Sequence, residues 1–170
     1  MKAKMNLIAL LYALFALPGL AFAATYYGDT NGDGVSDTVT TTTSSIQIYH
    51  PNLGTTKTYN ISGTFAVYTL SDTDGVTGLE VVVVRPNIIT VINDRLASMG
   101  NYNYPSTTYA IHSVSNTNSV VGNEIIVTMP NYVNVIHDSN GSISSYPFLG
   151  TTYGINSVAD TNGAAGNEHT

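Results

Sequence analysis

Short apolar segments separated by polar turns recur along most of the chain. Residues 124–129 are nearly all apolar, which is typical of a strand covered on both faces. A proline–asparagine turn leads to a second strand over 132–137, and an asparagine–glycine hairpin signal leads to a third over 142–148. Residues 152–158 supply a fourth strand. The pattern predicts four short antiparallel strands in one unit.

Two earlier stretches show the same order of strands. The predicted strands of the middle stretch cover 79–85, 88–92, 98–102 and 109–114, and those of the first stretch cover 37–42, 46–50, 56–61 and 65–70. No segment beyond residue 23 has a helical apolar period. The expected fold class is therefore all-β, with tandem four-stranded antiparallel repeats.

An acidic loop that opens a strand returns at a fixed interval of 44 residues, beginning at Asp72, Asn116 and Asp160. Four strands in a unit of about 40–50 residues are typical of β-propeller blades, whereas the coils of a β-solenoid repeat at shorter periods. The array is expected to be partial or completed by an oligomer, because about four to eight blades are needed to close a ring. The predicted blades cover about 25–70, 71–114 and 115–158, followed by a stub over 159–170.

The strongest local motif is the sequence DTNGDGVSD at residues 29–37. Calcium takes about six to eight oxygen ligands at roughly 2.3–2.6 Å, and such a loop offers them from alternate residues. The alternative is a polar turn without metal. Carboxylates held in one short turn repel each other unless a cation is present, which favours calcium. The expected ligands are the side chains of Asp29, Asn31, Asp33 and Asp37 and the backbone carbonyl of Val35.

The later loops match this pattern less closely; the second keeps three acids but has Val76 where the first has Asp33. The second loop offers Asp72, Asp74 and Glu80, and the fourth offers Asp160, Asn162 and Glu168. The third loop keeps Glu124 as its single acid and is interpreted as a structural turn. Because calcium affinity follows the charge of the ligands, we expect occupancy to fall from the first loop to the third.

The pattern at residues 29–37, followed by a strand, resembles the calcium loop of FG-GAP/VCBS-type repeats, the blades of integrin-α-like propellers. The loops at 72–80 and 160–168 are similar to degenerate members. The resemblance covers most of residues 25–170. It implies a secreted or surface-exposed binding module of the kind that is often appended to enzymes or adhesins.

The beginning of the chain has the pattern of an export signal. Lys2 and Lys4 precede an apolar run over 7–20, and an alanine–phenylalanine–alanine cleavage pattern ends at Ala23. A membrane anchor is the alternative, but the run is short for a span of about 20 residues and ends at a cleavage site. We therefore expect residues 1–23 to be a signal peptide and the mature protein to be secreted or surface-exposed.

The composition of the remaining 147 residues restricts the possible partners. They keep three of the five basic residues and all 11 acidic ones, so the net charge is −8, and there is no cysteine. Nucleic-acid binding needs clustered lysine and arginine and is not expected. An exported chain without disulfides must be held by its core, by metal or by assembly, and self-association is therefore considered.

Catalytic motifs are weak or missing in the sequence. There is no Gly-x-Ser-x-Gly motif, and no histidine pair has metal-binding spacing. Glu80 and Glu124 could form a glycosidase pair, but their equivalent places in the repeat argue for a structural or calcium role. We expect a Ca²⁺-binding module for adhesion to glycans or surface proteins that is not an enzyme by itself. The alternatives are a subunit of an extracellular fibre or oligomer and the propeller part of a polysaccharide-degrading enzyme.

Overall fold

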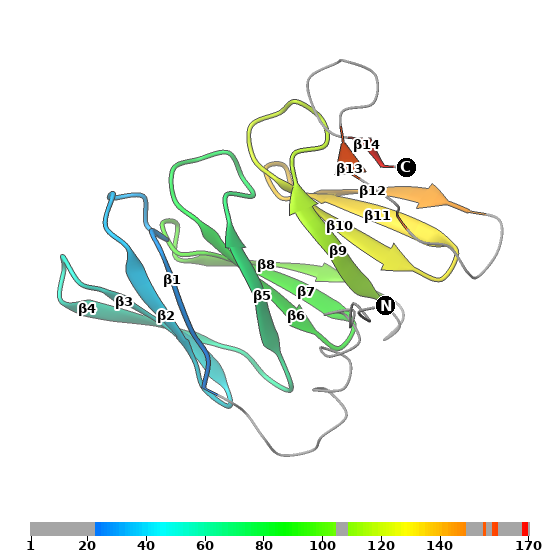
Figure 1. The fold of residues 1–170 in the computed structure, drawn as a ribbon. Coiled ribbons are helices and arrows are strands. Elements are labelled where there is room, and N and C mark those ends of the chain that lie inside the picture. Colours follow the sequence, from blue (N-terminus) through cyan, green and yellow to red (C-terminus); the bar gives the residue numbers. More distant parts are fainter. Residues whose placement is uncertain (1–22, 105–108, 149–154, 156–157, 160–167, 170) are drawn as a thin grey trace, which may run out of the picture.

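The computed structural model describes residues 23–104, 109–148, 155, 158–159 and 168–169. All regular elements in this part of the chain are β-strands, and three sheets of four antiparallel strands follow one another (Figure 1). This architecture confirms the predicted all-β class of tandem four-stranded antiparallel repeats.

Each sheet is a meander in which consecutive strands are paired. Sheet A consists of β1 (Thr25–Gly28), β2 (Asp37–Thr41), β3 (Ser45–His50) and β4 (Thr55–Asn60). Sheet B consists of β5 (Ala66–Ser71), β6 (Glu80–Arg85), β7 (Ile88–Asn93) and β8 (Ser98–Asn103). Sheet C consists of β9 (Ala110–Ser115), β10 (Glu124–Met129), β11 (Tyr132–His137) and β12 (Ser142–Pro147). A short further pair joins β13 (Val158–Ala159) to β14 (Glu168–His169).

The predicted strands between residues 37 and 148 agree with the observed ones to within one residue at each end, but their grouping differs. The segment 65–70 was expected to complete the first repeat; it forms β5 and pairs with β6 in sheet B. Likewise the segment 109–114 forms β9 and pairs with β10 in sheet C. Sheet A is completed by β1, which the apolar pattern did not predict.

The acidic loops explain this difference in grouping. A repeat of fixed period has no intrinsic starting point, so the sequence allows any of its strands to come first. Each acidic loop folds its two flanking strands into a hairpin, and the loop therefore lies within a sheet and not between two sheets. The units run over 25–60, 66–103 and 110–147, one strand earlier than the predicted blades. The predicted strand over 152–158 lies mostly outside the described residues.

Two apolar cores join the three sheets. The strand β6 is apolar from Val81 to Val84 because both of its faces are covered, and alternate side chains point to opposite faces. Val81 and Val83 lie in the core between sheets A and B with Val39, Ile46 and Ile48. Val82 lies in the core between sheets B and C with Ile125, Val127 and Ile136. Complete burial of such a side chain stabilises the fold by about 1.5–3 kcal/mol.

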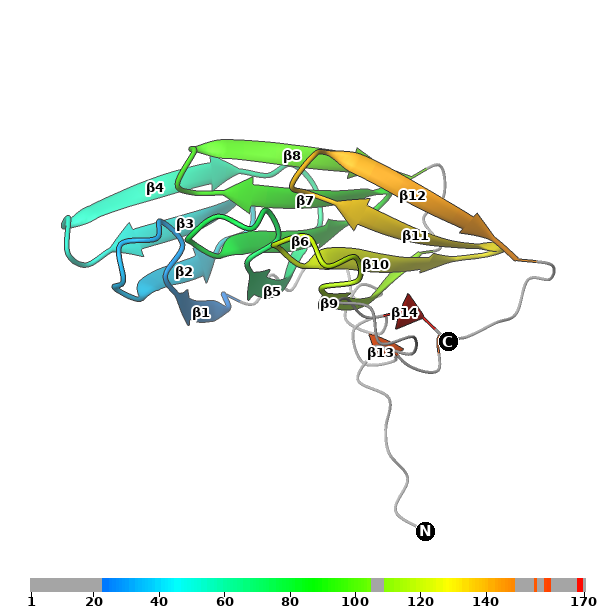
Figure 2. The same cartoon turned by 90° about the horizontal axis from the view of Figure 1, so that it is seen from above.

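The three sheets have the same orientation along the row. Figure 2 shows β4, β8 and β12 along one edge of the row and β1, β5 and β9 along the opposite edge. The acidic loops, which follow β1, β5 and β9, therefore lie at one end of the sheets (Figure 1). In the described part of the chain no helix has the length and hydropathy needed to cross a membrane.

Candidate metal centre

The three acidic loops are closed by equivalent backbone pairs, which are Gly28–Asp37, Ser71–Glu80 and Ser115–Glu124. The residues 29–37, 72–80 and 116–124 are called here the first, second and third loop, with positions 1 to 9. Position 9 is the first residue of the second strand of each sheet. Its side chain therefore starts from a rigid element at the base of the loop.

The carboxylate at position 9 turns inward in all three loops. In the first loop the backbone N–H and the hydroxyl of Thr30 donate to Asp37 Oδ2, at 2.9 and 2.7 Å. Thr73 donates in the same way to Glu80 Oε2 in the second loop, at 2.8 and 3.2 Å, and Thr117 to Glu124 Oε2 in the third, at 2.6 and 2.9 Å. One carboxylate oxygen of each loop is thus committed to holding the shape of the turn.

In the first loop the predicted ligands do not all meet. Asp29 accepts hydrogen bonds from the backbone N–H groups of Gly32, Asp33 and Gly34. Asp33 is exposed and accepts a hydrogen bond from the backbone N–H of Val35. This hydrogen bond holds the pKa of the Asp33 carboxyl below its usual value. Asp37 is fully buried and faces His50. The side chain of Asp33 therefore lies at the surface and that of Asp29 is half-buried, while Asp37 lies beneath the loop.

In the second loop the three predicted carboxylates converge. Ligand oxygens of Asp72, Asp74 and Glu80 all lie within 4.8 Å of one another. The amide of Asn93 donates to Asp74 Oδ2 at 2.8 Å and to Glu80 Oε1 at 3.1 Å. Burial raises the pKa of Glu80 to about 7; the neighbouring carboxylates of Asp74 and Asp138 add to the shift, and the hydrogen bonds from Thr73 oppose it. This site therefore holds more negative charge than its surroundings compensate.

The remaining two loops carry less of the predicted chemistry. In the third loop Glu124 is the single acid, and Asn116 accepts the backbone N–H of Ser119 at 3.0 Å. Asp160 and Asn162 of the fourth loop lie outside the described residues. Glu168 begins β14, and its backbone pairs with Ala159 in the same register that closes the other loops.

A buried cluster that includes His50 lies beneath the first loop and was not predicted from the sequence, in which no histidine pair has metal-binding spacing. The ligand atoms of Asp37, His50 and Asp94 lie within 4.8 Å of one another, and all three side chains are almost fully buried. Asp94 comes from the β7–β8 turn of sheet B and also accepts the hydroxyl of Tyr59 at 2.6 Å. The cluster therefore joins sheets A and B. The sequence signal that could have located His50 is its place in the repeat: it ends the third strand of sheet A, as Asn93 and His137 end the third strands of sheets B and C.

Neighbouring loops stack on one another through backbone contacts. The N–H of Leu79 donates to the carbonyl of Asp29, and between the next two loops the N–H of Asn123 donates to the carbonyl of Asp72, both at 2.8 Å. Position 4 must be glycine at these contacts: a Cβ on Gly32 would lie 2.5 Å from the carbonyl oxygen of Thr77. The second loop is thus packed between the first and the third.

Comparison with known proteins does not place the chain in a family. No protein-family model matches the chain, and no curated protein matches it.

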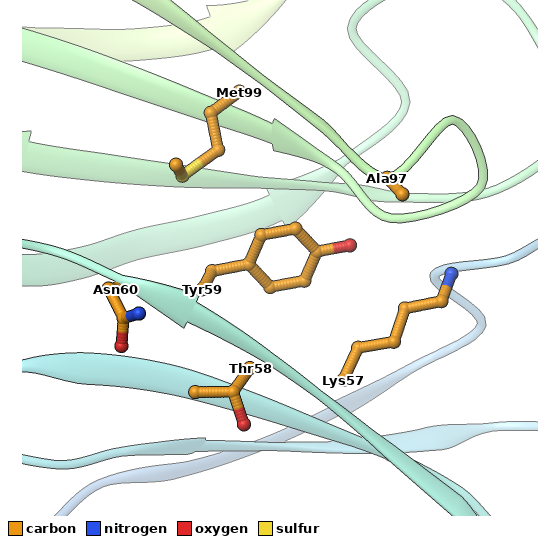
Figure 3. A pocket seen from close by; sticks show the side chains of 6 residues that line it. All are labelled: Lys57, Thr58, Tyr59, Asn60, Ala97 and Met99. Atoms are coloured by element: carbon orange, nitrogen blue, oxygen red, sulfur yellow. The ribbon is translucent and has the colours of Figure 1, made fainter.

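A shallow groove of about 420 Å³ separates β4 from the β7–β8 turn and β8. It is lined by Lys57, Thr58, Tyr59, Asn60, Ala97 and Met99 (Figure 3). The ammonium of Lys57 donates to the backbone carbonyl of Asp94 at 2.6 Å and lies 3.3 Å from its carboxylate, so this charge is already paired. The six lining residues carry no carboxylate, histidine or nucleophilic pair that could perform acid–base chemistry.

Proposed function

We propose that this protein is a calcium-binding tandem β-sheet module that attaches to glycans or surface proteins outside the cell, without catalytic activity of its own. The observation that carries the proposal is the convergence of Asp72, Asp74 and Glu80 within 4.8 Å of one another. Carboxylate oxygens are the ligands that calcium prefers, and backbone carbonyls and water complete its shell in flexible loops.

The electrostatics of the second loop support a cation at this place. Its three carboxylates accept hydrogen bonds from neutral donors, which are the amide of Asn93, the N–H and hydroxyl of Thr73 and the backbone N–H groups of Gly75 and Val76. The charged partner is Arg95, whose guanidinium lies 4.0 Å from Asp74. Charges of like sign in a partly buried site raise the free energy of the ionised state unless a counter-charge is present. A divalent cation supplies this counter-charge and would favour the ionised form of Glu80.

The proposed attachment role rests on the architecture and on the resemblance to FG-GAP/VCBS-type repeats. Sheets stacked in a row present long edges with little charge: β4, β8 and β12 are rich in serine, threonine, asparagine and tyrosine. Such edges offer hydrogen-bonding groups to a neutral polar ligand such as a glycan, or to an extended segment of another protein. An array of glycans tested with calcium and with EDTA examines this part of the proposal.

Calcium titration by calorimetry tests the metal site. We expect the wild-type chain to bind calcium and Glu80→Gln to bind it at least about tenfold more weakly, which corresponds to about 1.4 kcal/mol. The matched control is Glu124→Gln, which removes the equivalent carboxylate from the third loop and should leave calcium binding unchanged. Absence of binding by the wild type, or an equal loss in both variants, would contradict the proposal.

A further inference from the structure

One side chain approaches each loop from below, at the end of the third strand of its sheet. These residues are His50, Asn93 and His137, and each contacts the side chains at positions 3 and 9 of the loop above it. The three loops therefore have the same construction, and they differ in which group fills the space between positions 3 and 9.

An imidazole fills this space in the first and third loops. In the first, His50 Nδ1 lies 2.9 Å from Asp37 Oδ1 and 3.3 Å from the amide nitrogen of Asn31. In the third, His137 Nδ1 lies 3.7 Å from Glu124 Oε1 and 3.2 Å from the amide nitrogen of Asn118. Position 3 is an asparagine in both loops, so the ring lies between one carboxylate and one neutral amide.

The second loop has the opposite arrangement. Position 3 is an aspartate, position 9 is a glutamate, and the residue beneath them is Asn93, which offers a neutral amide. The loop with two carboxylates at these positions is thus the one without the imidazole. In the three described loops, an asparagine at position 3 has a histidine beneath it, and an aspartate at position 3 has an asparagine beneath it.

The ring of His50 lies between two buried carboxylates. Its Nδ1 faces Asp37, and its Nε2 faces Asp94 Oδ2 at 3.1 Å, outside hydrogen-bond geometry. The ring is only 1% exposed. Buried carboxylates on both sides of one ring require a compensating partner, and the histidine occupies the space between them and the loop residue Asn31.

We infer that the pair formed by position 3 and the residue beneath the loop decides which loop takes calcium. Asparagine with histidine excludes the ion, because position 3 lacks a carboxylate and the rigid imidazole fills the space between positions 3 and 9. Aspartate with asparagine admits it, because position 3 adds a carboxylate and the group in this space is the smaller amide of Asn93, whose oxygen is itself a ligand type that calcium accepts. The inference rests on the proposed function, in which calcium binds the second loop. It reverses the order expected from the match to the calcium-loop pattern, because the first loop, which matches it best, is blocked by His50.

The sharpest test is Asn93→His, which keeps all three acidic ligands of the second loop and adds only the ring. We expect calcium affinity, measured by calorimetry, to fall at least about 100-fold. The matched comparison is Asn93→Ala, which removes the same amide without adding a ring and should weaken calcium binding much less than Asn93→His does. Unchanged calcium binding in Asn93→His, in a variant whose circular dichroism is that of the wild type, would overturn the inference.

The reverse exchange tests the same rule in the first loop. Asn31→Asp combined with His50→Asn gives the first loop the same pair of residues as the second loop. The number of calcium ions bound per chain, measured by titration, should rise by one. A folded double variant that binds no additional calcium would contradict the inference. If the double variant does not fold, the comparison of Asn93→His with Asn93→Ala decides. A wild-type chain that binds no calcium would instead contradict the proposed function, so the two failures are distinguishable.

Discussion

At the scale of single residues, Asp94 and Asp138 join neighbouring sheets through equivalent contacts. Asp94 accepts hydrogen bonds from Thr30 and Tyr59 of sheet A, at 3.1 and 2.6 Å. Asp138, 44 residues later, accepts them from Thr73 and Tyr102 of sheet B, at 2.7 and 2.5 Å. Hydrogen bonds to a charged acceptor contribute about 1.5–3 kcal/mol each, and loss of one partner leaves the carboxylate less well compensated.

Removal of the Tyr102 hydroxyl should show how much its hydrogen bond to Asp138 stabilises the fold. We expect Tyr102→Phe to lower the free energy of unfolding by about 1–3 kcal/mol, because Asp138 loses a buried donor. The matched control is Tyr146→Phe at the equivalent position of sheet C, where the side chain is 51% exposed and the change should stay within about 0.5 kcal/mol. Urea denaturation of both variants measures the difference, and equal losses would contradict the role given to Asp138.

The same tyrosines predict a loss of stability at high pH. Burial, followed by the hydrogen bond to an aspartate, raises the pKa of both Tyr59 and Tyr102 above the ordinary value of 10. A group whose pKa is raised by folding contributes stability that is complete below its unfolded pKa and is lost as the pH rises above it. The thermal midpoint should therefore fall above about pH 10.

Comparison of variants assigns this pH dependence to a residue. Tyr102→Phe should start from a lower midpoint at pH 8 and lose less between pH 9 and pH 11 than the wild type does. The control is Tyr27, whose side chain is 73% exposed. Tyr27→Phe should reproduce the wild-type dependence of the thermal midpoint on pH. A Tyr102→Phe curve parallel to that of the wild type would show that Tyr102 does not carry the effect.

The position of each acidic residue could be predicted from the sequence, but the direction of its side chain could not. The spacing located Asp29, Asp33 and Asp37 correctly within one loop. It did not reveal that Asp37 turns inward to Thr30 and His50, because this depends on the residue that ends the third strand. The contact between Thr30 and Asp94 could not be predicted either, because it joins two sheets whose packing the repeat does not specify.

At the scale of elements, the stacked loops form a continuous part of the fold. Gly75, at position 4 of the second loop, has a φ of +78°, and a Cβ there would lie 2.4 Å from the carbonyl oxygen of Val121 in the third loop. The backbone carbonyl of Asp72 accepts the N–H of Asn123 nearby. Glycine is therefore required both by the left-handed conformation and by the close approach of the next loop.

Two glycine variants separate these requirements. Gly34, in the first loop, has a φ of +84°, and a Cβ there would meet no atom within 4 Å, so Gly34→Ala should cost about 1–2 kcal/mol for the left-handed backbone alone. Gly75→Ala should cost more, because the second and third loops must also move apart. Thermal or chemical denaturation of both variants is the measurement, and a cost for Gly75→Ala no larger than for Gly34→Ala would contradict the stacking.

Strands were predictable from the sequence where turn signals bounded them closely. The apolar runs of β6 and β10 lie between an acidic loop and a proline–asparagine turn, so their limits were found to within one residue. The strand β1 is only four residues long, Thr25–Gly28, and half of its side chains are exposed, so no apolar pattern marked it. The grouping into sheets depends on hydrogen bonds between strands, which a repeat of fixed period leaves undetermined.

At the scale of the whole molecule, the middle sheet holds the described structure together. Sheet B contributes Val81, Val83 and Ile92 to the core shared with sheet A, and Val82, Ile89 and Val91 to the core shared with sheet C. Its acidic loop packs between the other two loops and carries the converging carboxylates. A cation in this loop would therefore act on both junctions, through Thr73 toward Asp138 and through the backbone of Leu79 toward the first loop.

A thermal melt with and without calcium tests most directly whether a cation in the second loop stabilises the folded array. Binding to the folded state alone adds about 2.7 kcal/mol of stability when calcium is in hundredfold excess over its dissociation constant. We expect a higher midpoint in millimolar calcium than in EDTA for the wild type and a smaller or absent shift for Glu80→Gln. Equal midpoints of the wild type in calcium and in EDTA would contradict this expectation.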